Sequence, residues 1–253
     1  AGDVTHMGTN SFLSAPSSNK TACFHLNGHD LTTIGTRAFM GSGGVLNVMG
    51  NGTVCGSFSD NSSAGATVNI NTSVSAGTIN LYGGIYTKLS VNGKENPVVS
   101  VFNNGGQIHL YEGAEIRGDG NSYSAYLGAA NKANAVFGVH GGKITNGKLS
   151  ATEPSTTSGY TSTVIIDSAS CLEELVIREK AITTHISGMP VIERLALATD
   201  AKLTLGKLLP GAELAISANG IFTTEVDTPW AYLPYIRAWN APDSISATCR
   251  CKQ

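Results

Sequence analysis

The stretch Gly43–Gly50, GGVLNVMG, recurs along the chain with small changes. It returns as AGTINLYG at residues 76–83 and as GGQIHLYEG at residues 105–113, and a shorter echo, GGKITNG, follows at residues 141–147. The second glycine or its equivalent falls at positions 44, 77, 106 and 142, which gives steps of 33, 29 and 36 residues. An irregular period of roughly 20 to 50 residues is typical of stacked-repeat architectures.

Apolar residues alternate with polar ones inside each copy. This two-residue period indicates a strand with one buried face, because a helix would repeat every 3.6 residues. The alternating pairs are Leu46 and Val48, Ile79 and Leu81, and Ile108 and Leu110. Strands that recur once per coil and bury the same face predict an all-β fold, a parallel β-solenoid of about eight coils.

Composition narrows the setting of the protein. The 253 residues carry a formal net charge of −2, and charged residues make up only 13% of the chain, about half of the roughly 25% usual in globular proteins. Nucleic acids and anionic membranes select clustered Lys and Arg, so neither is expected as a partner. No apolar run reaches the roughly 18 residues of a membrane-spanning helix. A surface rich in Ser, Thr, Asn and Gly favours an extracellular location.

The chain divides into three segments that differ in composition and in the periodicity of apolar residues. Residues 1–20 are polar and aperiodic and are expected to form a leading strand or cap. Residues 21–227 carry the parallel β-helix, and after residue 163 short apolar strands follow one another at intervals of about 10 residues, which indicates shorter corners. Residues 228–253 are expected to form an aromatic cap over the last coil, and the residues predicted for it are Trp230, Tyr232, Tyr235 and Trp239.

Cysteines and histidines give weak site signals. Cys23 and Cys55 lie 32 residues apart, about one repeat, so they form either a disulfide or two thiols packed on neighbouring coils. Cys249 and Cys251 supply only two ligands, so no metal site is expected. His25 and His29 flank the Asn27–Gly28 turn and are expected to support it by hydrogen bonds. No cofactor is predicted.

Two segments resemble pectin-lyase-like right-handed parallel β-helices. The stretch TACFHLNGHDLT at residues 21–32 is similar to their opening rung, and residues 44–56 are similar to the rung that follows. Residues 211–223, GAELAISANGIFT, with the YLPY of residues 232–235, resemble the closing part of such modules. This likeness covers roughly residues 21–240. It implies a right-handed parallel β-helix in a secreted or wall-displayed module of the large surface proteins of gut Firmicutes.

The best-known members of this fold are polysaccharide lyases and hydrolases. A hydrolase of this kind needs paired carboxylates on neighbouring rungs, and a lyase needs an acidic calcium cluster with an Arg or Lys base. The sequence has no Asp-Asp pair and no Arg-Ile-Lys motif, and its aspartates are scattered singly. The remaining catalytic candidates are Glu112, Glu115, Arg117 and Asp119, with His109 before them and His140 about one coil later. Alternation places Glu115 and Arg117 outward if Ile116 points inward.

The sequence therefore favours a non-enzymatic extracellular module for surface display or adhesion. Its lateral face is expected to contact a glycan or a host surface protein through aromatic rings, and the predicted ligand-binding residues are Tyr82, Tyr86, Tyr111, Tyr123 and Tyr126. One alternative is a structural subunit that stacks end to end into a fibre or surface layer. A second alternative is a polysaccharide-active lyase or hydrolase.

Overall fold

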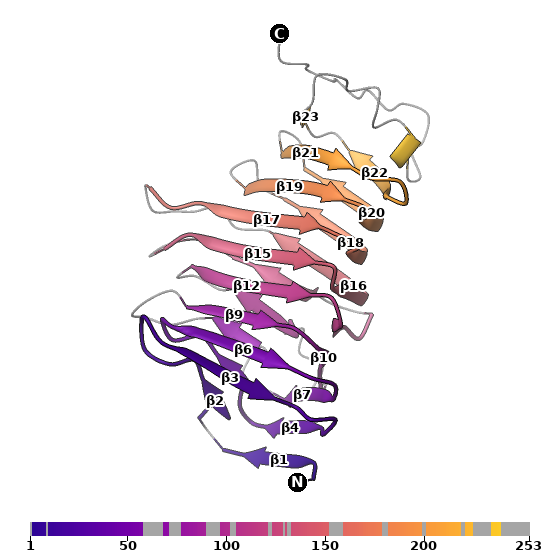
Figure 1. The fold of residues 1–253 in the computed structure, drawn as a ribbon. Coiled ribbons are helices and arrows are strands. Elements are labelled where there is room, and N and C mark those ends of the chain that lie inside the picture. The colour runs from indigo at the N-terminus through magenta and orange to yellow at the C-terminus, as the bar shows by residue number, and fades with distance from the viewer. Residues whose placement is uncertain are drawn as a thin grey trace.

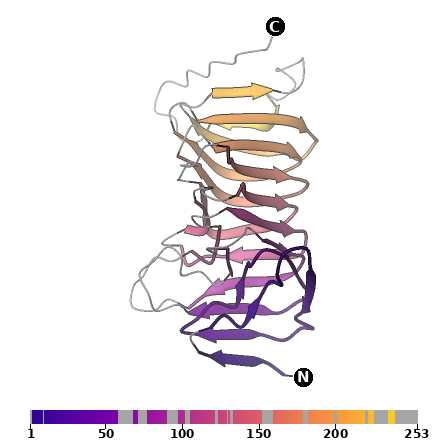
Figure 2. The same cartoon turned by 90° about the vertical axis from the view of Figure 1, so that its left-hand side faces the viewer.

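The computed structural model describes residues 2–8, 10–57, 68–70, 77–89, 97–101, 105–120, 123–128, 130, 133–151, 159–178, 182–198, 201–218, 221–224 and 234–238. In these residues the chain is all-β, and all the paired strands are parallel and stack one above another (Figure 1). Figure 2 shows the same stack from the side, with the strands lying across its long axis and the indigo and yellow strands at opposite ends. None of the described segments is a helix long and apolar enough to cross a bilayer.

One sheet receives one strand from each successive coil. Within the described residues it has nine strands, in the order of the chain, so the stack is slightly longer than the eight coils expected from the repeats. Its strands are β3 (Thr21–His25), β6 (Val45–Met49), β9 (Thr78–Leu81), β12 (Gly106–Tyr111), β15 (Ala135–His140), β17 (Ser162–Asp167), β19 (Ile182–Gly188), β21 (Lys202–Leu208) and β23 (Ile221–Thr224).

The second sheet has fifteen strands and begins as two separate limbs. The first limb contains β1 (Val4–Met7), β4 (Leu31–Ile34), β7 (Thr53–Ser57), β10 (Gly84–Lys88) and β13 (Ala114–Arg117). The second limb contains β2 (Leu13–Ser14), β5 (Phe39–Met40), β8 (Val68–Ile70), β11 (Val99–Val101) and β14 (Tyr123–Leu127). Residues 1–20, expected as a leading strand or cap, thus supply the outermost strand of each limb.

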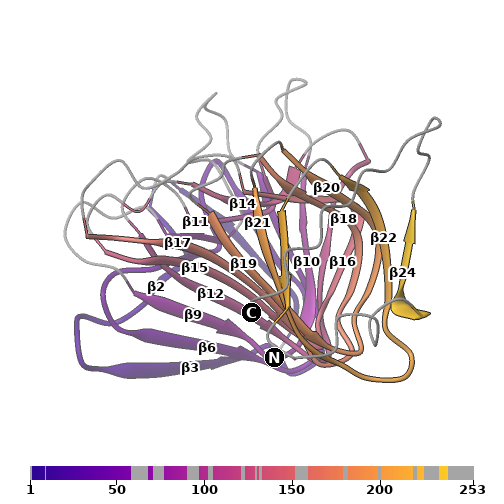
Figure 3. The ribbon, with the colours of Figure 1, turned by 90° about the horizontal axis from the view of Figure 1, so that it is seen from above.

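The two limbs merge at one long strand. Strand β16 (Lys143–Ala151) pairs with β13 through its first half and with β14 through its second half. Its Asn146 and Gly147 have positive φ angles of 52° and 155°, so the strand bends between the two directions. The later strands of this sheet continue from it, namely β18 (Cys171–Ile177), β20 (Val191–Leu197), β22 (Glu213–Ala218) and β24 (Ile236–Ala238). Figure 3 shows the sheets along the stack.

The alternating aliphatic residues fill the interior, as the sequence predicted. Leu46, Ile79 and Ile108 stand in register on β6, β9 and β12, and each is fully buried. Val48, Leu81 and Leu110 form the next buried column in the same strands. Burying a side chain of this size stabilises a fold by about 1.5–3 kcal/mol, so each coil contributes a similar apolar increment.

The glycine repeat is in register for three copies and not for the fourth. Gly44 is aligned with Gly77, and Gly77 with Gly106, at the start of strands in the nine-stranded sheet. The next residue in that position is Ala135. Gly142 instead precedes β16 in the fifteen-stranded sheet, where the next residue, Lys143, pairs with Glu115 of β13. The 36-residue step is therefore not a coil length, since a glycine pair precedes strands in both sheets.

Shorter coils follow residue 163, as predicted. The pairing of Val136 with Thr163 corresponds to a coil of 27 residues, and the pairing of Thr183 with Lys202 corresponds to a coil of 19. At the C-terminal end, Tyr235 and Ile236 pack against the core and β24 adds a strand beside β22. The other residues predicted for the cap, Trp230, Tyr232 and Trp239, lie outside the described residues.

Candidate functional site

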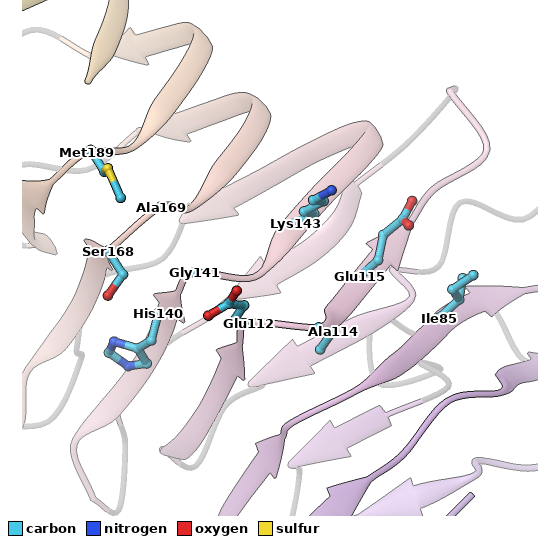
Figure 4. A pocket seen from close by; sticks show the side chains of 11 residues that line it. Ile85, Glu112, Ala114, Glu115, His140, Gly141, Lys143, Ser168, Ala169 and Met189 are labelled. Atoms are coloured by element: carbon cyan, nitrogen blue, oxygen red, sulfur yellow. The ribbon is translucent and has the colours of Figure 1, made fainter. Parts of the chain in front are cut away.

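An open cleft of about 870 Å³ runs along the corner where the nine-stranded sheet turns into the fifteen-stranded sheet. Figure 4 shows its lining residues following one another across successive coils. They are Ile85, Glu112, Gly113, Ala114, Glu115, His140, Gly141, Lys143, Ser168, Ala169 and Met189. The corner cleft thus combines two carboxylates, an ammonium group, an imidazole and a hydroxyl with several small apolar side chains.

Tight turns between the sheets place these side chains. Glu112 and Gly113 connect β12 to β13, and Gly141 lies between β15 and β16. Gly113 and Gly141 have φ angles of 91° and 89°, a left-handed conformation that glycine adopts without strain. Because each coil turns at the same corner, polar turn residues from separate parts of the chain form one continuous wall.

Glu115 and Arg117 point outward from β13 and form an ion pair. Ile116 between them is fully buried, as the alternation predicted. The Arg117 Nε and Nη2 atoms donate to the two Glu115 carboxylate oxygens at 2.9 and 3.0 Å, and the Thr145 hydroxyl donates to Oε1 at 2.6 Å. The hydrogen bond from Arg117 lowers the pKa of Glu115, which therefore stays ionised.

The four predicted catalytic residues do not share one site. Glu112 and Glu115 line the corner cleft, whereas Asp119 does not. The Asp119 carboxylate forms an ion pair with Lys88 Nζ at 3.2 Å, and the Lys88 side chain is almost buried. Arg117 is exposed and bound to Glu115. Glu112 and Glu115 therefore belong to the wall of the cleft, whereas Asp119 forms a separate ion pair with Lys88.

A hydrogen-bonded chain of side chains lies beside the cleft. His109 Nδ1 lies 3.0 Å from His140 Nε2, and His140 Nδ1 lies 2.9 Å from Asp167 Oδ2. At the other end, His109 Nε2 lies 3.1 Å from Gln107 Oε1. Burial, followed by the positive charge of His140, lowers the pKa of His109 to about 4.

Sequence reasoning noted the one-coil spacing of His109 and His140 but missed Gln107 and Asp167. Asp167 follows His140 by 27 residues and pairs with it on the neighbouring strand. Polar residues recur at strand ends at intervals of one coil, and this periodicity could have identified Asp167.

Two of the predicted tyrosines form a stacked column with His140. The rings of Tyr82 and Tyr111 lie 4.4 Å apart at an angle of 12°, and the ring of Tyr111 lies 5.1 Å from that of His140. Tyr111 is the middle member, so its ring faces are covered by its neighbours. Tyr82 is 42% exposed and is the outer member of this column.

The prediction that Tyr86 and Tyr126 belong to an exposed binding face is wrong. Tyr86 is fully buried, and its hydroxyl donates to the Gly83 carbonyl at 2.8 Å. It points inward because it stands in register with Val54 and Ile116, two core residues. Tyr126 is only 7% exposed.

Tyr123 lies away from the corner cleft. Its ring has Lys148 Nζ 5.3 Å from its centroid and the Arg178 guanidinium at 5.9 Å. The five tyrosines therefore do not form one surface. The candidate binding surface is therefore not a lateral face formed by all five tyrosines. It is the corner cleft together with the short column that ends at His140.

The candidate disulfide between Cys23 and Cys55 is not formed, and both are free thiols. Cys23 is on β3 of the nine-stranded sheet and is aligned with Asn47, whereas Cys55 is on β7 of the other sheet and is aligned with Thr32. Their 32-residue spacing is one coil plus the turn to the second sheet, so the two residues do not stack.

The Asn27–Gly28 turn has the predicted histidine support on one side. The backbone N–H of Asn27 donates to His25 Nδ1 at 3.1 Å. His29 Nδ1 lies instead 3.8 Å from the Asp3 carboxylate. In the part of the chain that the structure describes, no three His, Cys, Asp or Glu side chains are arranged to hold a metal ion.

Comparisons with protein families, curated proteins and solved structures found no match to this chain.

Proposed function

We propose that this chain is a right-handed parallel β-helix that acts as a non-enzymatic extracellular module, and that its corner cleft holds a glycan chain. The small, uncharged and hydroxyl-rich composition supports an extracellular setting. The observation that carries the proposal is the mixed lining of the cleft across neighbouring coils.

The lining suits a hydroxylated polymer. The Glu112 and Glu115 carboxylates accept hydrogen bonds from sugar hydroxyls, and Lys143 donates them. Ile85 and Met189 provide apolar surface for the C–H faces of sugar rings at the two ends of the lining. Neighbouring strands in a sheet are about 4.8 Å apart, so a cleft that crosses several coils accommodates an extended chain better than a compact ligand.

The tyrosine column meets the cleft only through its last member, His140. Because Tyr82 and His140 cover the two faces of Tyr111, that ring is not free to stack on a sugar. Its hydroxyl forms a hydrogen bond with the Tyr82 side chain. This arrangement favours recognition by polar groups in the cleft over recognition by stacked aromatic rings.

The state of Glu115 supports the non-enzymatic reading. A glycosidase of the two-carboxylate type needs one protonated carboxyl group as general acid. Arg117 and Thr145 bind the ionised form of Glu115, so this residue is a poor proton donor at neutral pH. Glu112 alone does not complete such a pair.

Calorimetric titration with polygalacturonate and with a neutral β-glucan tests the proposal. We expect Glu112→Gln to weaken binding of the neutral β-glucan about tenfold, the loss of one charge-assisted hydrogen bond of roughly 1.5 kcal/mol. Glu213→Gln is the matched control, because Glu213 is an exposed glutamate at the start of β22 and does not line the cleft. Equal losses in both variants, or no binding to a broad glycan array, would contradict a glycan site in the cleft.

The enzymatic alternative has its own readout. Uronic-acid polymers incubated with the protein would yield unsaturated products from a lyase or new reducing ends from a hydrolase. Reproducible turnover that Glu115→Gln abolishes would overturn the non-enzymatic proposal.

End-to-end stacking into a fibre is the second candidate function. Strands β1 and β3 are terminal members of their sheets among the described residues, so each has an edge at the N-terminal end of the stack. Such an edge is a template for pairing with another strand. Filaments in electron micrographs, together with no binder on the glycan array, would favour this structural role over the binding module.

A further inference from the structure

Two imidazole nitrogens face each other beside the corner cleft. They are Nδ1 of His109 on β12 and Nε2 of His140 on β15, 3.0 Å apart. The outer nitrogen of each ring faces an acceptor, the Asp167 carboxylate for His140 and the Gln107 carbonyl oxygen for His109. An acceptor requires an N–H on the nitrogen that faces it. Two neutral rings would then direct two lone pairs at each other, which is repulsive at this distance.

A proton between the rings resolves this conflict. We propose that His109 and His140 bind one shared proton as an imidazole–imidazolium pair with Asp167 as its counter-ion, and that uptake of a second proton, which breaks this pair, makes ligand retention in the corner cleft depend on pH. In this state His140 donates through Nδ1 to Asp167 and through Nε2 to His109. His109 donates through Nε2 to Gln107, so every hydrogen bond of the chain is satisfied.

Gly138 provides the space in which the rings meet. It is the residue in register with His109 on the neighbouring strand. A Cβ atom at this position would lie 2.4 Å from His140 Nε2 and 2.5 Å from His109 Nδ1. Gly138 is not among the glycines with positive φ, so its backbone does not itself require glycine. Glycine at position 138 therefore leaves room for the close contact between the two ring nitrogens.

The surroundings favour a single positive charge. The groups that face the pair are Asn80 and Tyr82 from the β9 coil, Tyr111 and Glu112 at the end of β12, Asp167 and Ser168 at the end of β17, Lys143 across the corner, and His185 on β19 beyond Ile165. The Ser168 hydroxyl donates to Asp167 Oδ1 at 3.0 Å and so stabilises the ionised carboxylate. Tyr111 stacks on the His140 ring, where a cation is attracted to the aromatic face.

A second proton would break the pair. Both facing nitrogens would then carry N–H groups, and no acceptor would remain between the rings. The pKa of His109, lowered to about 4 by burial and by the charge on His140, fits late uptake of this second proton. Since His140 lines the cleft, separation of the rings at acidic pH changes the cleft wall directly.

Nitrogen NMR of the histidine rings tests the proton-binding site without any ligand. In the wild-type protein we expect His109 and His140 to titrate together in two steps, the second near pH 4, with a strongly deshielded proton between the rings. Gly138→Ala should separate the rings and give two independent single steps closer to the ordinary value of about 6.5. His6→Asn, a histidine change on β1 at the N-terminal end of the stack, should leave the His109 and His140 signals unchanged.

Two results would overturn this proposal. One is independent titration of His109 and His140 near pH 6.5 in the wild-type protein. The other is tight binding of added Zn²⁺ at neutral pH with loss of the inter-ring proton, which would assign the facing nitrogens to a metal. Thermal unfolding verifies that Gly138→Ala remains folded, and Asp167→Asn provides a second variant, expected to release the shared proton at lower pH than the wild type.

The effect on the cleft rests on the proposed function and has a separate measurement. We expect the affinity for the neutral β-glucan to fall at least threefold between pH 6 and pH 3.5 in the wild type, and to change less in Gly138→Ala. A pH response that is the same in both proteins would contradict the coupling. If the β-glucan binds neither protein, the proposed ligand is wrong, whereas the NMR result still decides whether the proton site exists.

Discussion

At the scale of single residues, the interior of the solenoid contains a polar group that it does not use. Thr184 on β19 occupies a fully buried position in register with Val164 and Leu203, and its hydroxyl has no hydrogen-bond partner within the described structure. An unpaired buried hydroxyl costs about 1–3 kcal/mol. The position therefore holds threonine where the coil pattern favours an aliphatic residue.

Thr184→Val should stabilise the protein. Valine has nearly the same shape and removes the unsatisfied hydroxyl, so we expect the free energy of unfolding to rise by roughly 1 kcal/mol. Urea unfolding measures the change. Thr183→Val is the control, because Thr183 is exposed on the same strand and should give little gain. A lower stability in Thr184→Val would indicate that the hydroxyl has a partner after all.

His109 makes stability depend on pH. Its pKa in the folded protein is about 4, below the value of about 6.5 for a free histidine. The unfolded chain therefore binds more protons between these values, and stability falls as the pH drops from about 6.5 to about 4. After allowance for solvent screening at this partly exposed ring, the loss is on the order of 2 kcal/mol.

The measurement is the unfolding free energy of wild type and His109→Asn across this pH window. We expect the variant to have a smaller slope against pH, because the titrating ring is gone. An unchanged slope would show that other groups cause the acid sensitivity.

At the scale of elements, the corners decide whether the strands stack. A Cβ atom on Gly44 would lie 2.6 Å from each of three backbone carbonyl oxygens, those of Pro16, Ser17 and Lys20. Backbone atoms of a neighbouring coil have little freedom to move away. Residue 44 is therefore glycine because the coils approach each other closely there. Its backbone conformation does not require glycine, since Gly44 is not among the glycines with positive φ.

Gly44→Ala should destabilise the protein by roughly 1–3 kcal/mol, the usual cost of overpacking. Gly8→Ala serves as the control, because its Cβ would meet only the His6 ring at ordinary contact distance. Chemical unfolding of both variants gives the comparison. Similar small effects in the two would mean that the coil can shift to accept a methyl group at residue 44.

The sequence predicted the strands better than their partners. The alternation of Leu46 and Val48 was sufficient to assign a buried face, because a strand has a fixed two-residue period. Tyr86 was expected on the lateral binding face with the other tyrosines, yet its register with Val54 and Ile116 places it inside. Register depends on corner lengths, which vary between coils, so pairings such as Cys23 with Cys55 could not be derived from spacing.

The site was harder to predict than the fold. Glu112 and Glu115 could be selected because they stand close together in the sequence, and both line the cleft. The side-chain chain from Gln107 to Asp167 joins three coils, and its two links between coils connect residues 31 and 27 positions apart. Only stacking brings these side chains together, and the space that Gly138 leaves between two rings has no signature in the local sequence.

At the scale of the whole molecule, parallel coils provide a straight surface along which turn residues recur. The same corner supplies the carboxylates, the lysine, the His140 ring and the apolar ends of one cleft. Extended polymers match such a surface because both repeat along one direction. The central claim is therefore that the corner cleft, and not the set of tyrosines, is the binding surface.

A crystal structure of the protein soaked with an oligogalacturonate tests this claim most directly. We predict sugar density along the corner cleft, with hydroxyl groups within hydrogen-bond distance of Glu112 and Lys143. Sugar density confined to the Tyr123 surface beside Lys148 and Arg178, with the corner cleft unoccupied, would contradict the account.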